Sequence, residues 1–146
     1  MKIKSLITPI GNFNSFYVNS LLVKLVYIDN LKSSYKSDLS LQKIMNKFFS
    51  NGGLRKIPEC SLQGTPFQLK LWDALIQIPR GQTESYSSLA YKIGFPGAAR
   101  AVGTACRLNP IPLLIPCHRA VKKDGSIGDF ALGKVNKAYL LTMESE

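Results

Sequence analysis

The sequence predicts an α+β protein in which a small N-terminal α+β domain, residues 1–60, precedes a mainly helical domain, residues 61–146. Three observations support this prediction. Residues 13–19 and 21–28 are short apolar runs rich in valine, isoleucine, phenylalanine and tyrosine, which favour strands. Apolar residues then recur at helical spacing over 41–49. In the second domain, capping residues, prolines and glycines separate several short helices, two of which form a helix-turn-helix pattern.

Composition and charge restrict the class of protein. The chain has 146 residues, of which 45% are apolar and 19% charged, so it can bury a core and is not disordered by composition. Lysine and arginine number 19 against 9 aspartates and glutamates, which leaves a formal charge of +10. A basic surface of this kind indicates a polyanionic partner, most often nucleic acid, with an acidic membrane surface as the alternative.

The cysteines and the apolar runs indicate a location. Cys60, Cys106 and Cys117 are an odd number without paired spacing, which argues against a secreted disulfide scaffold. The apolar run near the N-terminus is too short for a signal peptide, and no run approaches the roughly 20 residues of a membrane span. We therefore expect a reduced, soluble, intracellular protein, cytoplasmic or, in a eukaryote, nuclear, with no membrane partner.

The first domain is expected to contain a hairpin and a helix. The two apolar runs meet at Asn19-Ser20, which predicts a β-hairpin. After a polar stretch over 29–40, one helix face is formed by Leu41, Ile44, Met45, Phe48 and Phe49. Asn-Gly-Gly at 51–53 is expected to end this helix. Residues 54–63 show no periodicity and contain Pro58, which indicates a linker.

The second domain opens with a strong helix-start signal. Thr65 stands at an N-cap position with Pro66 at the first helical position and Gln68 three residues after the cap, which together form a capping box. The apolar face of this helix is expected to contain Phe67, Leu71, Ala74, Leu75 and Ile78. The helix should end before Pro79-Arg80-Gly81.

Two further short helices follow. Ser85 can cap one that Gly94 terminates, and the next runs from Ala98 to about Arg107. The tight turn between them gives the helix-turn-helix pattern, although most helix pairs with glycine turns bind nothing. The second of the pair is rich in alanine and glycine, with Arg100 and Arg107 as its long side chains. It either packs closely against its neighbours through small residues or enters a DNA groove with an arginine as its probe.

The last part of the chain combines a proline-rich segment, a turn and a helix. Residues 109–116 hold three prolines around an apolar run, which predicts an extended, buried segment. A hairpin is expected over 121–130, around Asp124-Gly125. A final helix should run from about Lys134 to Glu144, with these residues near the core: Val135, Ala138, Leu140 and Leu141.

Cys117 and His118 are the candidate chemical pair. A reactive cysteine needs a base or a positive field, because the thiolate is the nucleophile and a free thiol has a pKa of about 8.5. A histidine can accept the thiol proton directly or through water, and a carboxylate can orient that histidine. The alternative is that Cys117 is a small buried hydrophobic residue and His118 a surface loop residue. With one histidine and three scattered cysteines, no four-ligand zinc site is visible, so we expect no metal and no cofactor.

The motifs of the second domain occur together in one known family. They include Asn109-Pro110 and Ile115-Pro116-Cys117-His118-Arg119, and other short motifs in the same order. These are Gly64-Thr65-Pro66-Phe67-Gln68, Leu71-Trp72, Ile78-Pro79-Arg80-Gly81, Ser85-Tyr86, Leu89-Ala90, Ala99-Arg100-Ala101-Val102-Gly103, Gly125, Gly133, Lys137 and Leu140-Leu141. From Gly64 to Glu144 the chain therefore resembles the O6-alkylguanine-DNA alkyltransferases, also called methylated-DNA–protein-cysteine methyltransferases. Thr8-Pro9-Ile10-Gly11 looks like the start of that family's N-terminal domain, but residues 1–60 match loosely and are shorter than usual.

The resemblance implies a reaction and the residues that perform it. Cys117 would take a methyl or other alkyl group from O6 of guanine in DNA, and also from O4 of thymine, in one irreversible step. His118 would act as the base through a bound water, and Glu144 would orient it. Asn109 would hold the turn before the active-site segment. Since Glu144 lies near the chain end, the alternative for it is a frayed, solvent-exposed residue.

The resemblance also implies how DNA is bound. The partner would be double-stranded DNA carrying O6-alkylguanine, approached by a monomer through the minor groove, and the damaged base would be flipped out of the stack. Arg100 would fill the space of the flipped nucleotide, and Tyr86 would crowd the adjacent phosphate. The full set of expected DNA-binding residues is Tyr86, Ala99, Arg100, Gly103 and Arg107. Binding through the minor groove depends little on the base sequence of the DNA.

The alkyl pocket and the fold complete what the resemblance implies. The pocket residues would be Ala120, Phe130, Ala131 and Leu132. The first domain would be a shortened ribonuclease-H-like domain and the second a winged-helix-like domain. The chain departs from the family at Asp129, where a small or amide residue is usual, and at Ala120, Phe130 and Leu132, where valine, tyrosine and glycine are common. Cys60 alone cannot form the zinc site that some members have in the first domain.

Three other functions compete with this hypothesis. A non-catalytic lesion-binding protein of the alkyltransferase-like kind would lack the acceptor cysteine, which is present here as Cys117. A general basic DNA-binding module would keep Cys117 for structural reasons only. A Cys-His hydrolase would need a route for water to release the covalent intermediate.

Overall fold

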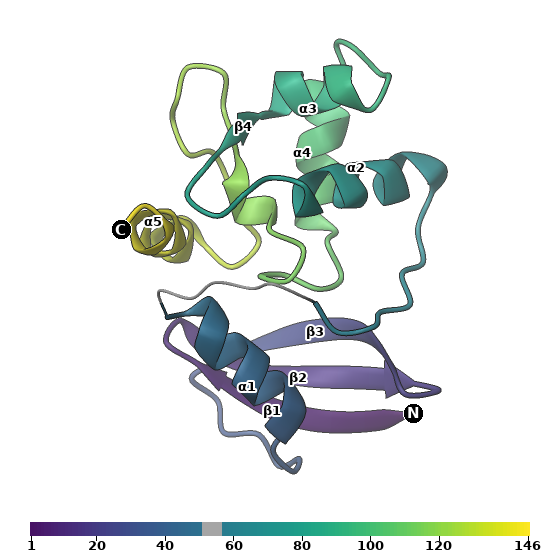
Figure 1. The fold of residues 1–146 in the computed structure, drawn as a ribbon, viewed down its shortest axis with the longest axis vertical. Coiled ribbons are helices and arrows are strands. Elements are labelled where there is room, and N and C mark those ends of the chain that lie inside the picture. The colour runs from purple at the N-terminus through teal and green to yellow at the C-terminus, as the bar shows by residue number, and fades with distance from the viewer. Residues whose placement is uncertain (51–56) are drawn as a thin grey trace. The chain divides into compact units, whose positions relative to one another are not determined.

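A computed structural model of the chain describes residues 1–50 and 57–146. It has a mixed α/β fold made of two compact units, Met1–Leu62 and Gln63–Glu146 (Figure 1). The division lies two residues after the boundary expected from the sequence. Within the described residues, no helix is long and apolar enough to cross a membrane.

The N-terminal unit is built on a three-stranded antiparallel sheet in the order β1-β2-β3. Its strands are β1 (Lys2–Thr8), β2 (Gly11–Val18) and β3 (Leu21–Asp29). The predicted hairpin is confirmed: Asn19 and Ser20, with φ of 50° and 66°, join β2 to β3 in the left-handed conformation that tight hairpin turns require. Strand β1 was not predicted, because its mixed lysine and apolar pattern becomes a strand only by pairing with β2.

One helix, α1 (Leu39–Phe48), lies across a face of this sheet (Figure 1). Its predicted apolar face is confirmed at Leu41, Met45 and Phe48, which are buried. The expected stop at 51–53 and the first linker residues, 54–56, lie outside the described residues. The rest of the expected linker is not free of structure: the backbone N–H of Leu22 in β3 donates to Glu59, and that of Ser61 donates back to Leu22.

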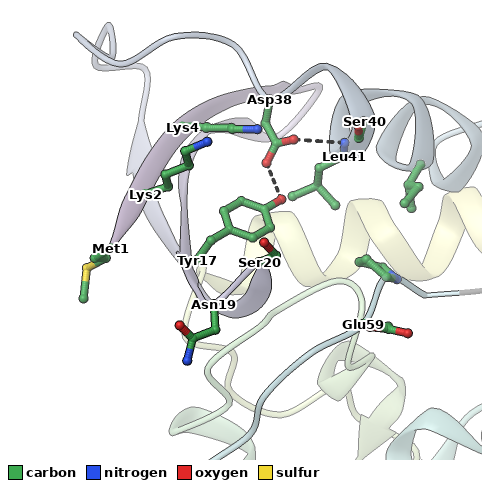
Figure 2. Close-up of a pocket in the computed structure, with 12 residues that line it drawn as sticks. Met1, Lys2, Lys4, Tyr17, Asn19, Ser20, Asp38, Ser40, Leu41 and Glu59 are labelled. Atoms are coloured by element: carbon green, nitrogen blue, oxygen red, sulfur yellow. Dashed lines mark hydrogen bonds between the residues drawn. The ribbon is translucent and has the colours of Figure 1, made fainter.

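Asp38, the N-cap of α1, is a buried carboxylate at the edge of a cavity of about 520 Å³. Figure 2 shows its oxygens directed at Tyr17 and at the backbone of Leu41. Oδ2 accepts hydrogen bonds from Ser15 Oγ (2.7 Å) and Tyr17 Oη (2.5 Å), and Oδ1 accepts one from Leu41 N (3.1 Å). Burial and this contact raise the pKa of Tyr17. None of the predicted site residues lines this cavity.

The C-terminal unit begins with α2 (Pro66–Ile76), whose predicted capping box is present in full. Thr65 Oγ1 accepts from the backbone N–H of Gln68, and the Gln68 side chain accepts from the N–H of Thr65. Trp72 is buried, and its Nε1–H donates to the carbonyl of Ala105 (3.0 Å), so it ties α2 to the next helical pair.

That pair is α3 (Tyr86–Lys92) and α4 (Ala99–Arg107), which pack against each other (Figure 1). Both predicted helices are confirmed, and Ser85 caps α3 by accepting from the N–H of Ser88. Gly94 and Gly97 have φ of 88° and 85°, so the turn between the helices uses two positions that favour glycine.

Two predictions for the segment after α4 were partly wrong. Residues 111–116 are buried, as expected, but they form a turn rather than an extended run: Leu113 has φ of 76°, and Ile115 N–H donates to Ile111. The turn at Asp124-Gly125 is present, yet residues 126–130 form no strand. Instead, β5 (Ala120–Val121) pairs in parallel with β4 (Glu84–Ser85), a distant segment that hairpin patterns cannot reveal.

The last helix, α5 (Lys134–Glu144), has the predicted bounds and only part of the predicted buried face. Leu140 is buried as predicted and Leu141 is half-buried, whereas Val135 is 84% exposed and Ala138 is also exposed. Lys137 and Glu144 are buried as well. Because the charged residues Lys137 and Glu144 occupy the buried face, the spacing of apolar residues in this helix did not identify that face.

Candidate active site

Cys117, His118 and Arg119 form a single turn of 3-10 helix, η1 (Cys117–Arg119), in the interior of the C-terminal unit. The apolar residues before it, Leu113 to Ile115, are buried and carry the turn into the core. Cys117 is 3% exposed and His118 is fully buried. The expectation that His118 could be a surface loop residue is therefore wrong.

Glu144, in the last turn of α5, reaches this turn. His118 Nε2 lies 2.9 Å from Glu144 Oε1. Arg119 donates to both carboxylate oxygens, from Nε to Oε1 (2.9 Å) and from Nη2 to Oε2 (2.6 Å). Its Nη1 donates to the carbonyl of Ile78 (2.7 Å). Since the Glu144 side chain is only 1% exposed, the alternative of a frayed end is excluded.

The backbone at Gly81 lies close to the backbone of Glu144 at the end of α5. Gly81 has φ of 84°, and a Cβ at this position would lie 3.0 Å from the Glu144 carbonyl oxygen. The Pro79-Arg80-Gly81 motif therefore provides both a left-handed turn and the space for the end of α5. Ile78, just before it, supplies the carbonyl that Arg119 binds.

The charges of this network define the state of the histidine. Burial opposes ionisation of Glu144, but hydrogen bonds from Arg119 and His118 outweigh it and hold the pKa of Glu144 at about 2. Burial lowers the pKa of His118 despite the opposing effect of Glu144. At neutral pH Glu144 is therefore ionised and His118 neutral. An ionised carboxylate only accepts, so Nε2 carries the ring proton and the lone pair is on Nδ1.

Cys117 is a buried thiol. Burial raises its pKa to about 11, while hydrogen bonding to Asn109 and the charge of Lys137 act in the opposite direction. Burial and the neighbouring Cys117 raise the pKa of Cys106 to about 12. Little thiolate exists at neutral pH, so any reaction at Cys117 requires removal of its proton at the site.

Asn109 holds the turn that leads to Cys117. Its Nδ2 donates to the carbonyl of Ile115 (2.7 Å), and its Oδ1 accepts from the N–H of Ile111 (2.9 Å). These two bonds span the chain on both sides of the left-handed Leu113. The amide thus satisfies backbone groups that a buried turn leaves without strand partners.

Two functional candidates were not identified from the sequence: Arg119 and Lys137. Both lie within motifs shared with the alkyltransferases, but no pattern in the sequence indicates a role for either. Lys137 is fully buried, and its Nζ donates to the carbonyl of Ala120 (2.6 Å), to Tyr86 Oη (3.2 Å) and to the carbonyl of Asp129 (3.3 Å). Burial lowers its pKa, while Cys117 and Cys106 raise it. A buried lysine on an amphipathic helix looks like a solvent-facing one in sequence, so only its motif could have signalled it.

The expected DNA-binding residues lie on α3 and α4. Arg100 and Arg107 are exposed, and Ala99 and Gly103 are partly exposed. Nothing lies within 4 Å of a Cβ built at Gly103, so this face of α4 is open. Tyr86 opens α3 half-buried, and burial raises its pKa to about 12.

The expected pocket residues differ in how far they are buried. The Phe130 ring lies 6.3 Å from the His118 ring, centroid to centroid, and is half-buried. Leu132 is also half-buried, and Ala131 is exposed. Ala120, the residue directly after η1, is fully buried, and its carbonyl accepts from Lys137. No group of three or more His, Cys, Asp or Glu side chains that could hold a metal ion occurs within residues 1–50 and 57–146.

Comparison with known proteins identifies the family. Residues 66–146 match the sequence model of the 6-O-methylguanine DNA methyltransferase DNA-binding domain, which is more than half of the chain. The chain belongs to this family. Over its full length it is 38% identical to the probable methylated-DNA–protein-cysteine methyltransferase of Acanthamoeba polyphaga mimivirus, 98% of which is aligned. It spans only 24% and 32% of two longer Ada proteins that it also matches.

Solved structures of alkyltransferases have the same fold. The chain resembles Mycobacterium tuberculosis OGT, solved in complex with DNA, with a TM-score of 0.88 and 33% identity over 98% of this chain and 92% of that one. It also resembles S. pombe Atl1, solved with damaged DNA containing O6-carboxymethylguanine. That match has a TM-score of 0.50 and 32% identity, and it covers 56% of this chain and 78% of Atl1.

Proposed function

We propose that this protein repairs DNA by transferring a methyl or other alkyl group from O6 of guanine, and from O4 of thymine, to its own Cys117. It is a methylated-DNA–protein-cysteine methyltransferase that acts once per molecule. The observation that supports this best is the buried arrangement of Cys117 beside the His118–Glu144–Arg119 network. This arrangement lies within the region that the family model matches.

The network provides the proton transfer that a thiol with a pKa of about 11 requires. His118 Nδ1 accepts the proton of Cys117, through a bound water, and Glu144 stabilises the resulting imidazolium. Arg119 keeps the Glu144 carboxylate ionised and fixed by two hydrogen bonds. Lys137 adds a positive charge that favours the thiolate. Asn109 holds the turn that carries the sulfur.

The transfer itself exchanges one bond for another. The Cys117 thiolate attacks the alkyl carbon, an S–C bond forms, and the C–O6 bond breaks with its electron pair going to the guanine. The guanine then takes up the proton that His118 carries, which restores the normal base and a neutral histidine. The product is a thioether, and nothing on the described surface of the site supplies a nucleophile to cleave it. Each molecule therefore repairs one lesion.

DNA binding is assigned to α3 and α4. Exposed Arg100 and Arg107 and the open surface at Gly103 support a helix that enters the minor groove of double-stranded DNA as a monomer. O6 of a stacked guanine cannot reach a buried sulfur, so the base must be flipped, with Arg100 in its place. Tyr86 and Ala99 contact the adjacent backbone. Phe130, Ala131, Leu132 and Ala120 surround the alkyl group.

The finer assignments of fold and location are also part of the proposal. The three-stranded sheet with α1 is a shortened ribonuclease-H-like domain, and the C-terminal unit is winged-helix-like, with residues 122–126 as its wing turn. The protein works in the cytoplasm, or in the nucleus of a eukaryote.

The test is to mix the protein with duplex DNA containing one O6-methylguanine and to weigh the peptides. We expect one methyl group per protein molecule on the Cys117 peptide, and no transfer with Cys117→Ser, which should still bind the duplex. A methyl group on Cys60 or Cys106, or repair of many lesions per molecule, contradicts the proposal. Tight binding to the lesion without any transfer would favour the alkyltransferase-like function suggested by the match to S. pombe Atl1.

A further inference from the structure

An aromatic and basic cluster lies on the surface of the C-terminal unit, at the turn between α3 and α4. It consists of Phe95, Phe67 and Lys70, and we refer to it as the Phe95 cluster. The rings of Phe95 and Phe67 meet edge to face, with centroids 5.2 Å apart and an interplanar angle of 67°. Lys70 Nζ lies 5.6 Å from the centroid of the Phe95 ring. Phe95 is nevertheless 43% exposed.

The backbone fixes this ring at the surface. Phe95 N–H donates to the carbonyl of Ala90 (2.9 Å), and the Phe95 carbonyl accepts from Ala98 N–H (3.1 Å). Gly94 and Gly97, both with positive φ, enclose the segment. The contact with Phe67 restricts the ring further. An aromatic side chain held outward in this way is ready to bind without losing much conformational freedom.

The position and charge of the cluster point to DNA as its partner. Phe95 precedes Ala98, the N-cap of α4, by three residues, and Arg100 follows on the same helix. Lys70 forms no ion pair with any carboxylate of the described chain, whereas Lys92 on α3 is paired with Glu84. The cluster therefore presents an apolar ring and an available cation beside the helix assigned to the groove. Minor-groove proteins use apolar side chains such as phenylalanine against base steps, together with basic residues.

We propose that the Phe95 cluster is an additional DNA-contact site, which rests on the proposed DNA-repair function. The Phe95 ring packs against the sugar and base edges of a minor-groove step beside the lesion, and Lys70 binds a phosphate next to it. Phe67 supports the ring from behind. The cluster contributes affinity for duplex DNA whether or not it is damaged, and it takes no part in the chemistry at Cys117.

The experiment measures the affinity of the full-length protein for an undamaged fluorescent duplex. Phe95→Ala should weaken binding by about tenfold, which corresponds to about 1.4 kcal/mol. Phe95→Tyr keeps the ring and should bind within about twofold of the wild type. Lys70→Gln should reduce the slope of log K against log salt by about one, as loss of one phosphate contact requires. Unchanged affinity in Phe95→Ala, or an unchanged slope in Lys70→Gln, overturns the proposal.

Matched controls come from the N-terminal unit, where Lys24 Nζ lies 4.6 Å from the Phe16 ring centroid. Phe16→Ala and Lys24→Gln should leave affinity and slope unchanged. An equal loss of affinity in these variants would show that the effect is not specific to the Phe95 cluster. That outcome overturns the proposal. Thermal unfolding of every variant shows whether Phe95→Ala still folds; if it does not, Phe95→Tyr and Lys70→Gln decide.

Two more measurements separate the possible failures. Sedimentation of the wild type and Phe95→Ala tests whether the cluster binds a second copy of the chain instead; a dimer lost in the variant would overturn the DNA proposal. The rate of methyl transfer at saturating damaged duplex should be the same in Phe95→Ala and the wild type. If the wild type transfers no methyl group, the proposed function fails, whereas the affinity result still decides the contact site.

Discussion

At the scale of single residues, the site depends on two buried charged side chains, Arg119 and Lys137. No amphipathic pattern in the sequence indicates that they are buried. Cys117 and His118 could be singled out from the sequence because proline, cysteine and histidine stand together in an apolar segment, whereas Asn109 and Glu144 were indicated only by the resemblance to the alkyltransferases. Arg119 and Lys137 could not be singled out, because their roles follow from burial. Arg119 binds both oxygens of Glu144, and Lys137 donates to three oxygens in the interior. Arg119 and Glu144 are 25 positions apart in sequence, and Lys137 and Tyr86 are 51 apart, so only the fold brings them into such pairs.

Glu144→Gln should slow methyl transfer and shift the rise of its pH–rate profile to higher pH. Glu144 raises the pKa of His118, so its neutralisation lowers that pKa further and makes the histidine a weaker base for Cys117. The reaction then depends on thiolate that Cys117 forms by direct ionisation, and this thiolate increases only as the pH approaches the Cys117 pKa of about 11. We expect a loss of about ten- to one hundredfold at pH 7, the size of a weakened general base. The measurement is the single-turnover rate between about pH 6 and about pH 9, from about one unit below neutrality to about two units above it. An unchanged rate and profile would show that Glu144 is only structural.

The same substitution should change the acid stability of the protein. The pKa of Glu144 falls from 4.5 to about 2 on folding, which corresponds to roughly 3 kcal/mol. Because the folded-state pKa is the lower one, this contribution is complete above about pH 5 and is lost as the pH falls towards 2. Chemical denaturation should therefore show a less stable Glu144→Gln at neutral pH and a smaller difference from the wild type near pH 3. A difference that does not change with pH would contradict this prediction.

Lys137→Met should raise the pKa of Cys117 above its value of about 11, because the lysine charge is one of the factors that lower it. We expect a shift of about one unit, as for the loss of a nearby charge. The measurement is the pH dependence of iodoacetamide labelling, followed on the Cys117 peptide so that Cys60 and Cys106 do not interfere. Lys134→Met, an exposed lysine of the same helix, is the control and should leave the profile in place. An unshifted Cys117 profile in Lys137→Met would show that the lysine has only a packing role.

At the scale of elements, local signals were sufficient for the helices and for the β2–β3 hairpin, and insufficient for the other strands. The capping box of α2 and the Ser85 cap of α3 are formed by residues within four positions, so the sequence could specify them. Strand β1, and the pairing of β5 with β4, depend on partners that no local pattern names. The segment 111–116 was expected to be extended because prolines forbid a helix, yet the two Asn109 hydrogen bonds stabilise a turn.

At this scale, the DNA-binding role proposed for helix α4 can be tested through its two exposed arginines. Arg100→Ala should lower the repair rate of a duplex lesion by about ten- to one hundredfold and change duplex affinity by less than about threefold, since a side chain in the base stack acts on the flipped state. Arg107→Ala, the other exposed arginine of the helix, should do the reverse: weaker binding with an unchanged rate at saturation. The second control is the lesion in a single strand, where no base pair must open. A normal duplex repair rate in Arg100→Ala would exclude the proposed inserted side chain.

At the scale of the whole molecule, the formal charge of +10 and the small exposed residues of α4 favour binding through phosphates rather than through base recognition. If Arg107 and Lys70 each neutralise one phosphate, log K should fall linearly with log salt with a slope of about −2. Affinity for an undamaged duplex should then drop roughly twelvefold between about 50 and about 200 mM salt. Scrambling the bases around the site should change affinity by less than about threefold, because the minor groove distinguishes few base pairs. Fluorescence anisotropy titrations at four salt concentrations, on two duplexes of equal length and different sequence, measure both quantities. A slope near zero, or a strong preference for one duplex, would mean that base contacts rather than phosphates dominate, and that the basic surface serves another partner.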